Sequence, residues 1–95
     1  MARVVVNFYG ELKEKIGTDR IFMQGYTIKE ILKKIKEKYP SLEKDIEYGR
    51  VILLINGRNI ETLKKEDTSL EDFDLVGLTL KDGGMIDFFP PDGGG

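Results

Sequence analysis

The segment from Thr27 to Pro40 has the clearest helical pattern in the chain, and it limits the folds available to the rest. Thr27 and Glu30 have the spacing of a capping box, in which each side chain satisfies an amide at the start of a helix. Apolar residues then recur at helical spacing, at Ile28, Ile31, Leu32, Ile35 and Tyr39. Lysine and glutamate fill the remaining face, and Pro40 ends the pattern. A helix with one apolar face must pack against another element, so we expect a sheet to cover it.

Strand patterns stand on both sides of this helix. Residues 3–9 alternate as a first strand, and 20–24 form a second strand that returns beside it after a partly helical loop with a turn at Gly17. Val51 to Ile55 is an apolar run that predicts a central strand with both faces largely covered. Asn56-Gly57 then predicts a type I′ hairpin turn into a return strand.

The remaining segments complete the order of elements. SLEKDIEYG, residues 41–49, predicts a turn of helix with Ser41 as its cap and Gly49 as its stop. Residues 61–79 mix polar and apolar side chains and predict a long loop with one or two short elements. A turn at 81–84 leads into a last strand over 85–89.

The order strand, strand, helix, strand, strand, strand predicts an α+β fold of the β-grasp (ubiquitin-like) type, with a mixed sheet and one main helix packed on one face. A chain of 95 residues makes one small domain. We expect this domain to span residues 1–91, followed by a flexible C-terminal glycine tail over 92–95.

Composition excludes several classes of function. The chain has no cysteine and no histidine, which removes disulfides, thiolate nucleophiles, the usual zinc sites and imidazole acid–base chemistry. The net charge of −2 provides no basic field for nucleic acid. No apolar run approaches the roughly 20 residues of a membrane span, and no secretory signal is present, so we expect a cytoplasmic protein without a metal site, a nucleic-acid partner or a membrane partner.

The chain ends in FPPDGGG, residues 89–95. Proline fixes its own backbone and extends the residue before it, so Phe89-Pro90-Pro91 predicts a stiff base. Glycine resists being fixed, so residues 93–95 predict a slim projecting tip. The alternative interpretation is a frayed end or a cloning remnant.

With its preceding strand, this terminus resembles that of the ubiquitin-like sulfur carriers, and most of all the small subunit of molybdopterin synthase. The resemblance rests on LKDGGMIDFFPPDGGG, supported by VNFYGELKEKIG and LLINGRNI, and it covers essentially the whole chain apart from the longer 61–79 segment. The matching positions are Leu80, Asp82, Gly83, Phe88, Phe89, Pro90, Pro91, Gly94 and Gly95. Gly84 and Asp92 depart from the family pattern, which usually has an acid and an apolar residue there.

The resemblance implies a carrier whose C-terminal carboxylate, at Gly95, is adenylated and then converted to a thiocarboxylate. Gly94 and Gly95 would form the working end, because a side chain there would obstruct a narrow active site. The chain would bind no cofactor and supply no catalytic side chain of its own. ATP and a sulfur donor would act through an E1-like adenylating enzyme, and the large subunit of molybdopterin synthase would be the second partner.

Alternation also predicts where these partners dock. If Val4, Val6, Phe8, Ile86 and Phe88 line the core, the opposite sheet face carries Val5, Tyr9, Met85 and Phe89. An exposed apolar cluster of this kind usually marks an interface, unless the 61–79 segment covers it. The resemblance implies the same face, so the predicted partner-binding residues are Tyr9, Phe89, Pro90, Pro91, Gly93 and Ile60.

Three other functions remain open on the same residues. The activated Gly95 carboxylate would equally serve a ubiquitin-like modifier that forms isopeptide bonds with lysines. The related carrier for thiamin thiazole synthesis is the second alternative, although such chains are generally more compact. The third is a non-covalent β-grasp adaptor with an incidental tail.

Overall fold

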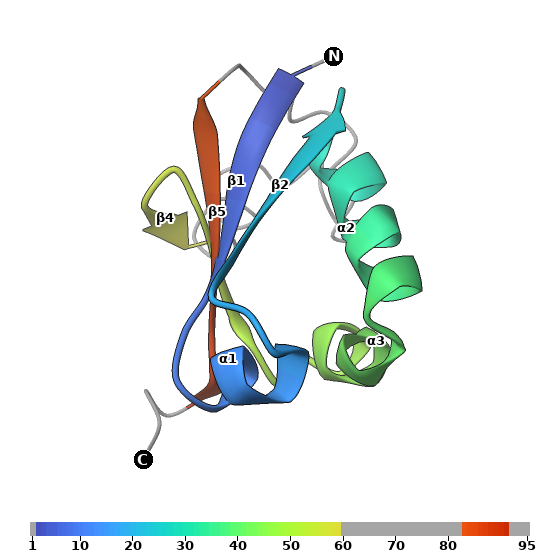
Figure 1. Cartoon of the computed structure of the whole chain (residues 1–95), viewed down its shortest axis with the longest axis vertical. Coiled ribbons are helices and arrows are strands. Elements are labelled where there is room, and N and C mark those ends of the chain that lie inside the picture. The colour runs from blue at the N-terminus through green and yellow to red at the C-terminus, as the bar shows by residue number, and fades with distance from the viewer. Residues whose placement is uncertain (1, 60–82, 92–95) are drawn as a thin grey trace, which may run out of the picture.

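The computed structural model describes residues 2–59 and 83–91. In these residues five strands form one sheet in the order β2-β1-β5-β3-β4 (Figure 1). The strands are β1 (Ala2–Phe8), β2 (Arg20–Gly25), β3 (Ile52–Ile55), β4 (Arg58–Asn59) and β5 (Gly84–Phe89). The helices are α1 (Glu11–Ile16), α2 (Ile28–Lys38) and α3 (Pro40–Glu47).

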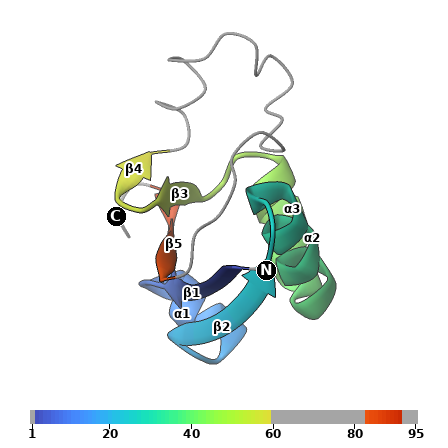
Figure 2. The ribbon, with the colours of Figure 1, turned by 90° about the horizontal axis from the view of Figure 1, so that it is seen from above.

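The sheet is mixed, because the first and last strands of the chain lie parallel at its centre. β1 pairs parallel with β5 and antiparallel with β2, while β3 pairs antiparallel with both β5 and β4. Figure 2 shows α2 and α3 on the same side of the sheet. This arrangement confirms the predicted β-grasp fold with one main helix on one face.

The predicted cap starts α2. The Thr27 hydroxyl oxygen accepts the Glu30 amide N–H at 3.2 Å, and the Glu30 carboxylate accepts the Tyr26 amide N–H at 3.1 Å. The carboxylate therefore reaches one residue further back than in a standard capping box. The lysine-rich face lies outward, and Lys34 bonds the Gln24 carbonyl oxygen at 2.6 Å.

The prediction for residues 41–49 was wrong about the cap and the length. Pro40 ends α2 as expected, but it also begins α3, which runs for eight residues. Proline suits the first helical position because the N–H that it lacks would have no partner in the helix. The N-cap position of α3 is therefore Tyr39. Ser41 lies inside the helix and has no capping role. Gly49 has φ +68° and follows α3, as the predicted stop requires.

The strands lie where alternation predicts them, with small shifts at their ends. β1 ends at Phe8 rather than Tyr9, and β5 begins at Gly84 rather than Met85. Positive φ values of 51° and 83° at Asn56 and Gly57 confirm the hairpin turn between β3 and β4. β3 is interior to the sheet, with one face buried and the other half-buried. The prediction that both faces of this strand are largely covered was therefore too strong.

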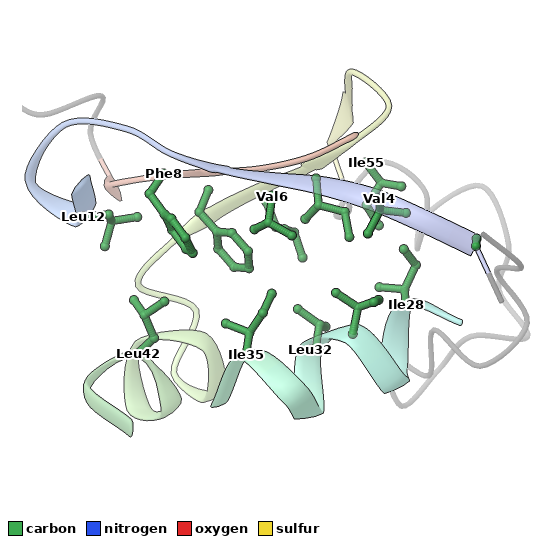
Figure 3. Packing of buried hydrophobic residues seen from close by; sticks show 14 residues of the cluster. Val4, Val6, Phe8, Leu12, Ile28, Leu32, Ile35, Leu42 and Ile55 are labelled. Atoms are coloured by element: carbon green, nitrogen blue, oxygen red, sulfur yellow. The ribbon is translucent and has the colours of Figure 1, made fainter. Parts of the chain in front are cut away.

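The core lies between the sheet and the helices (Figure 3). Its sheet side consists mainly of the predicted residues Val4, Val6, Phe8, Ile86 and Phe88, each at most 1% exposed. The Phe8 ring stacks on Phe88 with centroids 5.6 Å apart and meets Tyr39 edge-on at 5.8 Å. Leu42 of α3 is fully buried in the same core, so α3 contributes to the core beside α2.

Some predictions lie outside the described residues: the loop over 61–79, residues 81 and 82 of the last turn, and the tail over 92–95. The division into a domain and a tail therefore stays a prediction. Among the described helices, none has the length and apolar character needed to cross a membrane.

Candidate functional site

The strand register arranges the sheet face opposite α2, here called the outer face, in rows of paired side chains, three of which lie between Val5 and the end of β5. Directly paired residues on neighbouring strands point to the same face of a sheet. The tail-distal row is Phe22, Val5 and Met85; the polar row is Arg20, Asn7 and Asp87; the tail-proximal row is Tyr9, Phe89 and Ile52. A polar band thus separates two apolar patches.

The tail-proximal row is built on an aromatic pair. The Tyr9 ring lies on the Phe89 ring with centroids 4.4 Å apart and planes 5° from parallel. Phe89 is half-buried and Tyr9 is 39% exposed, so the pair presents apolar surface immediately before the two prolines. Ile52 of β3 pairs with Phe89 and extends the row.

The tail-distal row is more exposed. Phe22 is 70% exposed and Met85 is 42% exposed, with half-buried Val5 between them. Large apolar side chains at this level of exposure on three adjacent strands are typical of an interaction surface. The outer face therefore has apolar contact area on both sides of the polar row.

The polar row is a connected hydrogen-bond network. The Asn7 side-chain amide donates to Asp87 Oδ1 at 2.8 Å, and the Tyr9 hydroxyl donates to the same oxygen at 3.3 Å. Arg20 Nε donates to Asn7 Oδ1 at 2.9 Å. Asn7 and Asp87 are only 4% and 7% exposed, and a carboxylate so deeply buried requires such donors.

The network also sets the protonation of Tyr9. Partial burial raises the pKa of the Tyr9 hydroxyl above its ordinary value, and the charge and hydrogen bond of Asp87 raise it further. The Arg20 guanidinium acts in the opposite direction but does not cancel these effects. Tyr9 therefore remains a neutral phenol that donates to Asp87 at physiological pH.

The connection from β1 to α1 holds the end of β5. Gly10 has φ +57° and ψ −133°, and the Leu12 amide donates to the Tyr9 carbonyl oxygen at 3.1 Å. The Gly10 angles are those of the first central position of a type II′ turn, where a positive φ favours glycine. The Tyr9 amide donates to the Phe88 carbonyl oxygen at 3.1 Å, which ties this turn to the last strand.

Gly10 is also in contact with the tail base. A β-carbon at Gly10 would lie 3.1 Å from Pro90 Cγ and 3.4 Å from Pro90 Cδ. Pro90 is buried, whereas Pro91 is exposed. Pro91 is thus the first residue after β5 that faces solvent.

Of the predicted partner-binding residues, the structure brings Tyr9, Phe89 and Pro90 together around one turn. The ring of Pro90 has little surface left for a partner because it packs inside the chain. Pro91 is exposed beside them. Ile60, Gly93, Gly94 and Gly95 lie outside the described residues, so their roles stay predictions.

Sequence reasoning missed three features of the site. Alternation placed Asn7 and Asp87 opposite the core, but it could not show that they pair across 80 positions. Phe22 could have been found by the same alternation in RIFMQ. The contact of Gly10 with Pro90 leaves no local pattern, because it depends on the parallel pairing of β1 and β5.

A mixed β-grasp sheet with an apolar outer face and a C-terminal strand that ends beside that face defines the class of ubiquitin-like proteins. Comparison with known proteins narrows the class. Residues 6–95 match the model of the ThiS family, and the chain belongs to that family. No curated protein sequence shows significant similarity to the chain.

Solved structures agree with this assignment. The solution structure of small archaeal modifier protein 1 from Methanosarcina acetivorans is 33% identical over 100% of this chain and 98% of that one, with a TM-score of 0.72. A chain in the protein–protein complex of subunits 1 and 2 of molybdopterin-converting factor from Helicobacter pylori matches at 26% identity over 98% of this chain and 99% of that one, with a TM-score of 0.62. The crystal structure of small archaeal modifier protein 1 from Haloferax volcanii covers 99% and 100% at 18% identity and a TM-score of 0.68, which supports the fold alone.

Proposed function

We propose that this protein is a sulfur carrier that donates sulfur for molybdopterin biosynthesis, as the small subunit of a molybdopterin synthase. Membership of the ThiS family restricts the function to a sulfur carrier or a ubiquitin-like modifier. The observation that carries the proposal is the tail base: the Tyr9–Phe89 stack and buried Pro90 lie at the edge of an apolar face. Three residues, 91–93, separate Pro90 from the final Gly94-Gly95.

The chemistry begins at the Gly95 carboxylate. A carboxylate oxygen attacks the α-phosphorus of ATP, pyrophosphate leaves, and an acyl-adenylate forms. Sulfur at the oxidation level of sulfide then attacks the acyl carbon and expels AMP, which leaves a thiocarboxylate. The thiocarboxylate sulfur attacks an electrophilic carbon of the pterin precursor and displaces an oxygen leaving group from that carbon. Water then cleaves the acyl–sulfur bond, so the sulfur stays on the pterin and the Gly95 carboxylate is restored.

This chain contributes docking and presentation rather than catalytic groups. Histidine and cysteine are absent from its sequence, so the E1-like enzyme and the large subunit must supply the acid–base and sulfur-transfer chemistry. Partners would dock on the outer face with the Tyr9–Phe89 stack as anchor, and the remaining predicted contacts are Pro91, Gly93 and Ile60. The Helicobacter pylori complex, which contains subunits 1 and 2 of a molybdopterin-converting factor, supports a second-subunit partner.

Intact-mass spectrometry tests the proposal. The protein is incubated with an E1-like enzyme that activates it, ATP and a sulfur donor, and the mass should rise by the difference between one sulfur and one oxygen atom. A variant lacking Gly94 and Gly95 is the matched control and should not change. An unaltered wild-type mass, with an enzyme that demonstrably consumes ATP on this substrate, would exclude the carrier function.

A ubiquitin-like modifier is the second candidate, and the 33% identity to an archaeal modifier protein favours it. It uses the same acyl-adenylate, but a lysine amine of another protein attacks the acyl carbon and forms an isopeptide bond. Lysine adducts ending in Gly95 in host cells would support this function. Loss of molybdenum or tungsten enzyme activity on deletion of Gly95, without such adducts, would support the carrier instead.

A further inference from the structure

The turn at Tyr9-Gly10 meets the last strand and the first proline at three points. The Tyr9 ring stacks on Phe89, the Tyr9 amide binds the Phe88 carbonyl oxygen, and Gly10 lies against the Pro90 ring. A ring contact, a backbone hydrogen bond and a close backbone approach therefore fix three consecutive residues at the end of the sheet. We call this group of contacts the tail seat.

Gly10 differs from the other described glycines with positive φ. At Gly17, Gly49, Gly57 and Gly83, an added β-carbon would meet no heavy atom within 4 Å. Those positions need glycine for their backbone angles alone. At Gly10 the backbone angles disfavour a side chain, and an added β-carbon would also press on the Pro90 ring. Among the described glycines with positive φ, the tight contact is thus specific to Gly10 and the Pro90 ring.

The polar row restrains Tyr9, which is part of the tail seat. The Tyr9 hydroxyl is bound to Asp87, Asp87 is bound to Asn7, and Arg20 is bound to Asn7. The Tyr9 ring is therefore restrained at its hydroxyl end by this network and across its face by Phe89. Because the Tyr9 ring is held in this way, it provides a fixed surface for the packing of Phe89 and, after it, Pro90.

We propose that Gly10 is a positioning residue: through its contact with Pro90 it sets the direction in which the chain leaves the domain at Pro91. The proposal rests on the proposed function, in which the C-terminus enters a partner's active site. A tail base held in one direction loses less conformational freedom on insertion, so binding of the tail is tighter. The tail seat does not contact the reacting carboxylate. It therefore affects the binding of the tail rather than the chemical step.

The first test compares Gly10→Ala with Gly49→Ala in thiocarboxylate formation by the E1-like enzyme. Both substitutions place alanine at a positive φ, but only the first meets a proline ring. Gly10→Ala should raise KM by about three- to tenfold with little change in kcat. Gly49→Ala should leave both constants near wild type. Equal KM values for Gly10→Ala and wild type would overturn the proposal.

A double-mutant cycle separates the contact from the strain of the turn. Pro90→Ala removes the ring from the contact, and Pro91→Ala is its control because it loosens the chain without touching Gly10. If Gly10 acts through Pro90, the KM effect of Gly10→Ala should largely disappear in the Pro90→Ala background and persist in the Pro91→Ala background. Additive effects in the Pro90→Ala background would contradict a role through Pro90. If Gly10→Ala fails to fold, the KM of Pro90→Ala is compared with the KM of Pro91→Ala. This comparison tests the Gly10–Pro90 contact by changing the proline instead of the glycine.

A direct readout does not depend on the enzyme. The chain has no cysteine, so Lys29→Cys on α2 and Asp92→Cys in the tail can carry a single pair of spin labels. The distribution of label distances should be broader or displaced in Gly10→Ala and unchanged in Gly49→Ala. An identical distribution in all three proteins would refute the seat. If wild type forms no thiocarboxylate, the proposed function fails while this measurement still decides on the seat.

Discussion

Asn7 is the residue whose replacement best tests the physical account of the outer face. It donates the 2.8 Å hydrogen bond to Asp87, whose side chain is almost fully buried. Among the described residues, the Asp87 carboxylate accepts from two side-chain donors, and replacing Asn7 by leucine removes the one at the shorter distance and leaves the Tyr9 hydroxyl at 3.3 Å. A hydrogen bond to a charged group contributes about 1.5–3 kcal/mol, and an incompletely satisfied buried charge lies at the upper end of this range.

We therefore expect Asn7→Leu to lower the free energy of unfolding by about 2–3 kcal/mol at neutral pH. For a domain of this size, that loss lowers the melting temperature by roughly 10–20 °C. The double variant Asn7→Leu/Asp87→Leu removes the charge together with its donor. It should return to within about 1 kcal/mol of wild type, because apolar replacement of both partners of a buried polar pair is close to neutral.

Urea denaturation of the three proteins measures this difference, provided that the slope of the free energy against urea stays constant across them. The account requires the single variant to be clearly less stable than the double variant. If Asn7→Leu matches wild type, the network does not stabilise the fold. If the double variant is as unstable as Asn7→Leu, packing of leucine at these positions, rather than an uncompensated charge, determines the loss.

Three further changes test separate parts of the structure. Thr27→Ala should cost about 1 kcal/mol by removing the α2 cap, whereas Thr18→Ala, whose hydroxyl bonds only within an exposed turn, should cost less in the same urea assay. Leu42→Ala should cost about 2–5 kcal/mol because Leu42 is fully buried, and a smaller loss would show that α3 is not part of the core. Tyr9 should ionise above the ordinary tyrosine value of about 10, so an ultraviolet titration of wild type minus Tyr9→Phe should show a raised midpoint. Because the pKa of Tyr9 is raised in the folded state, Tyr9 stabilises the fold below the ordinary tyrosine pKa, and this stability is lost as the pH rises through the folded-state pKa. An unshifted midpoint would contradict the Asp87 contact.

The elements that the sequence predicts well are those with local causes. The α2 helix follows from Thr27, its apolar period and Pro40, and the β3–β4 hairpin follows from Asn56-Gly57. The start of α3 was missed because a proline that ends one helix can also begin the next, and no short pattern distinguishes these two uses. The strand ends shifted by one residue because they depend on pairing with other strands.

The candidate site likewise has a part that the sequence predicts and a part that depends on strand pairing. Alternation alone placed Tyr9 and Phe89 on one face, and the structure stacks them. The polar row and the tail seat depend on the parallel register between β1 and β5, which joins residues about 80 positions apart. Periodicity gives the face of a residue but not its partner on the next strand, so the role of Gly10 required the three-dimensional structure.

The most direct test of the central claim is the intact mass of the protein purified from its own host under mild, non-alkylating conditions. A sulfur carrier should carry a fraction of molecules heavier by the difference between sulfur and oxygen, with the added mass on the C-terminal peptide that contains Gly95. Deleting the E1-like enzyme from the host should abolish this fraction. A single unmodified mass in cells that are actively making molybdopterin would contradict the account.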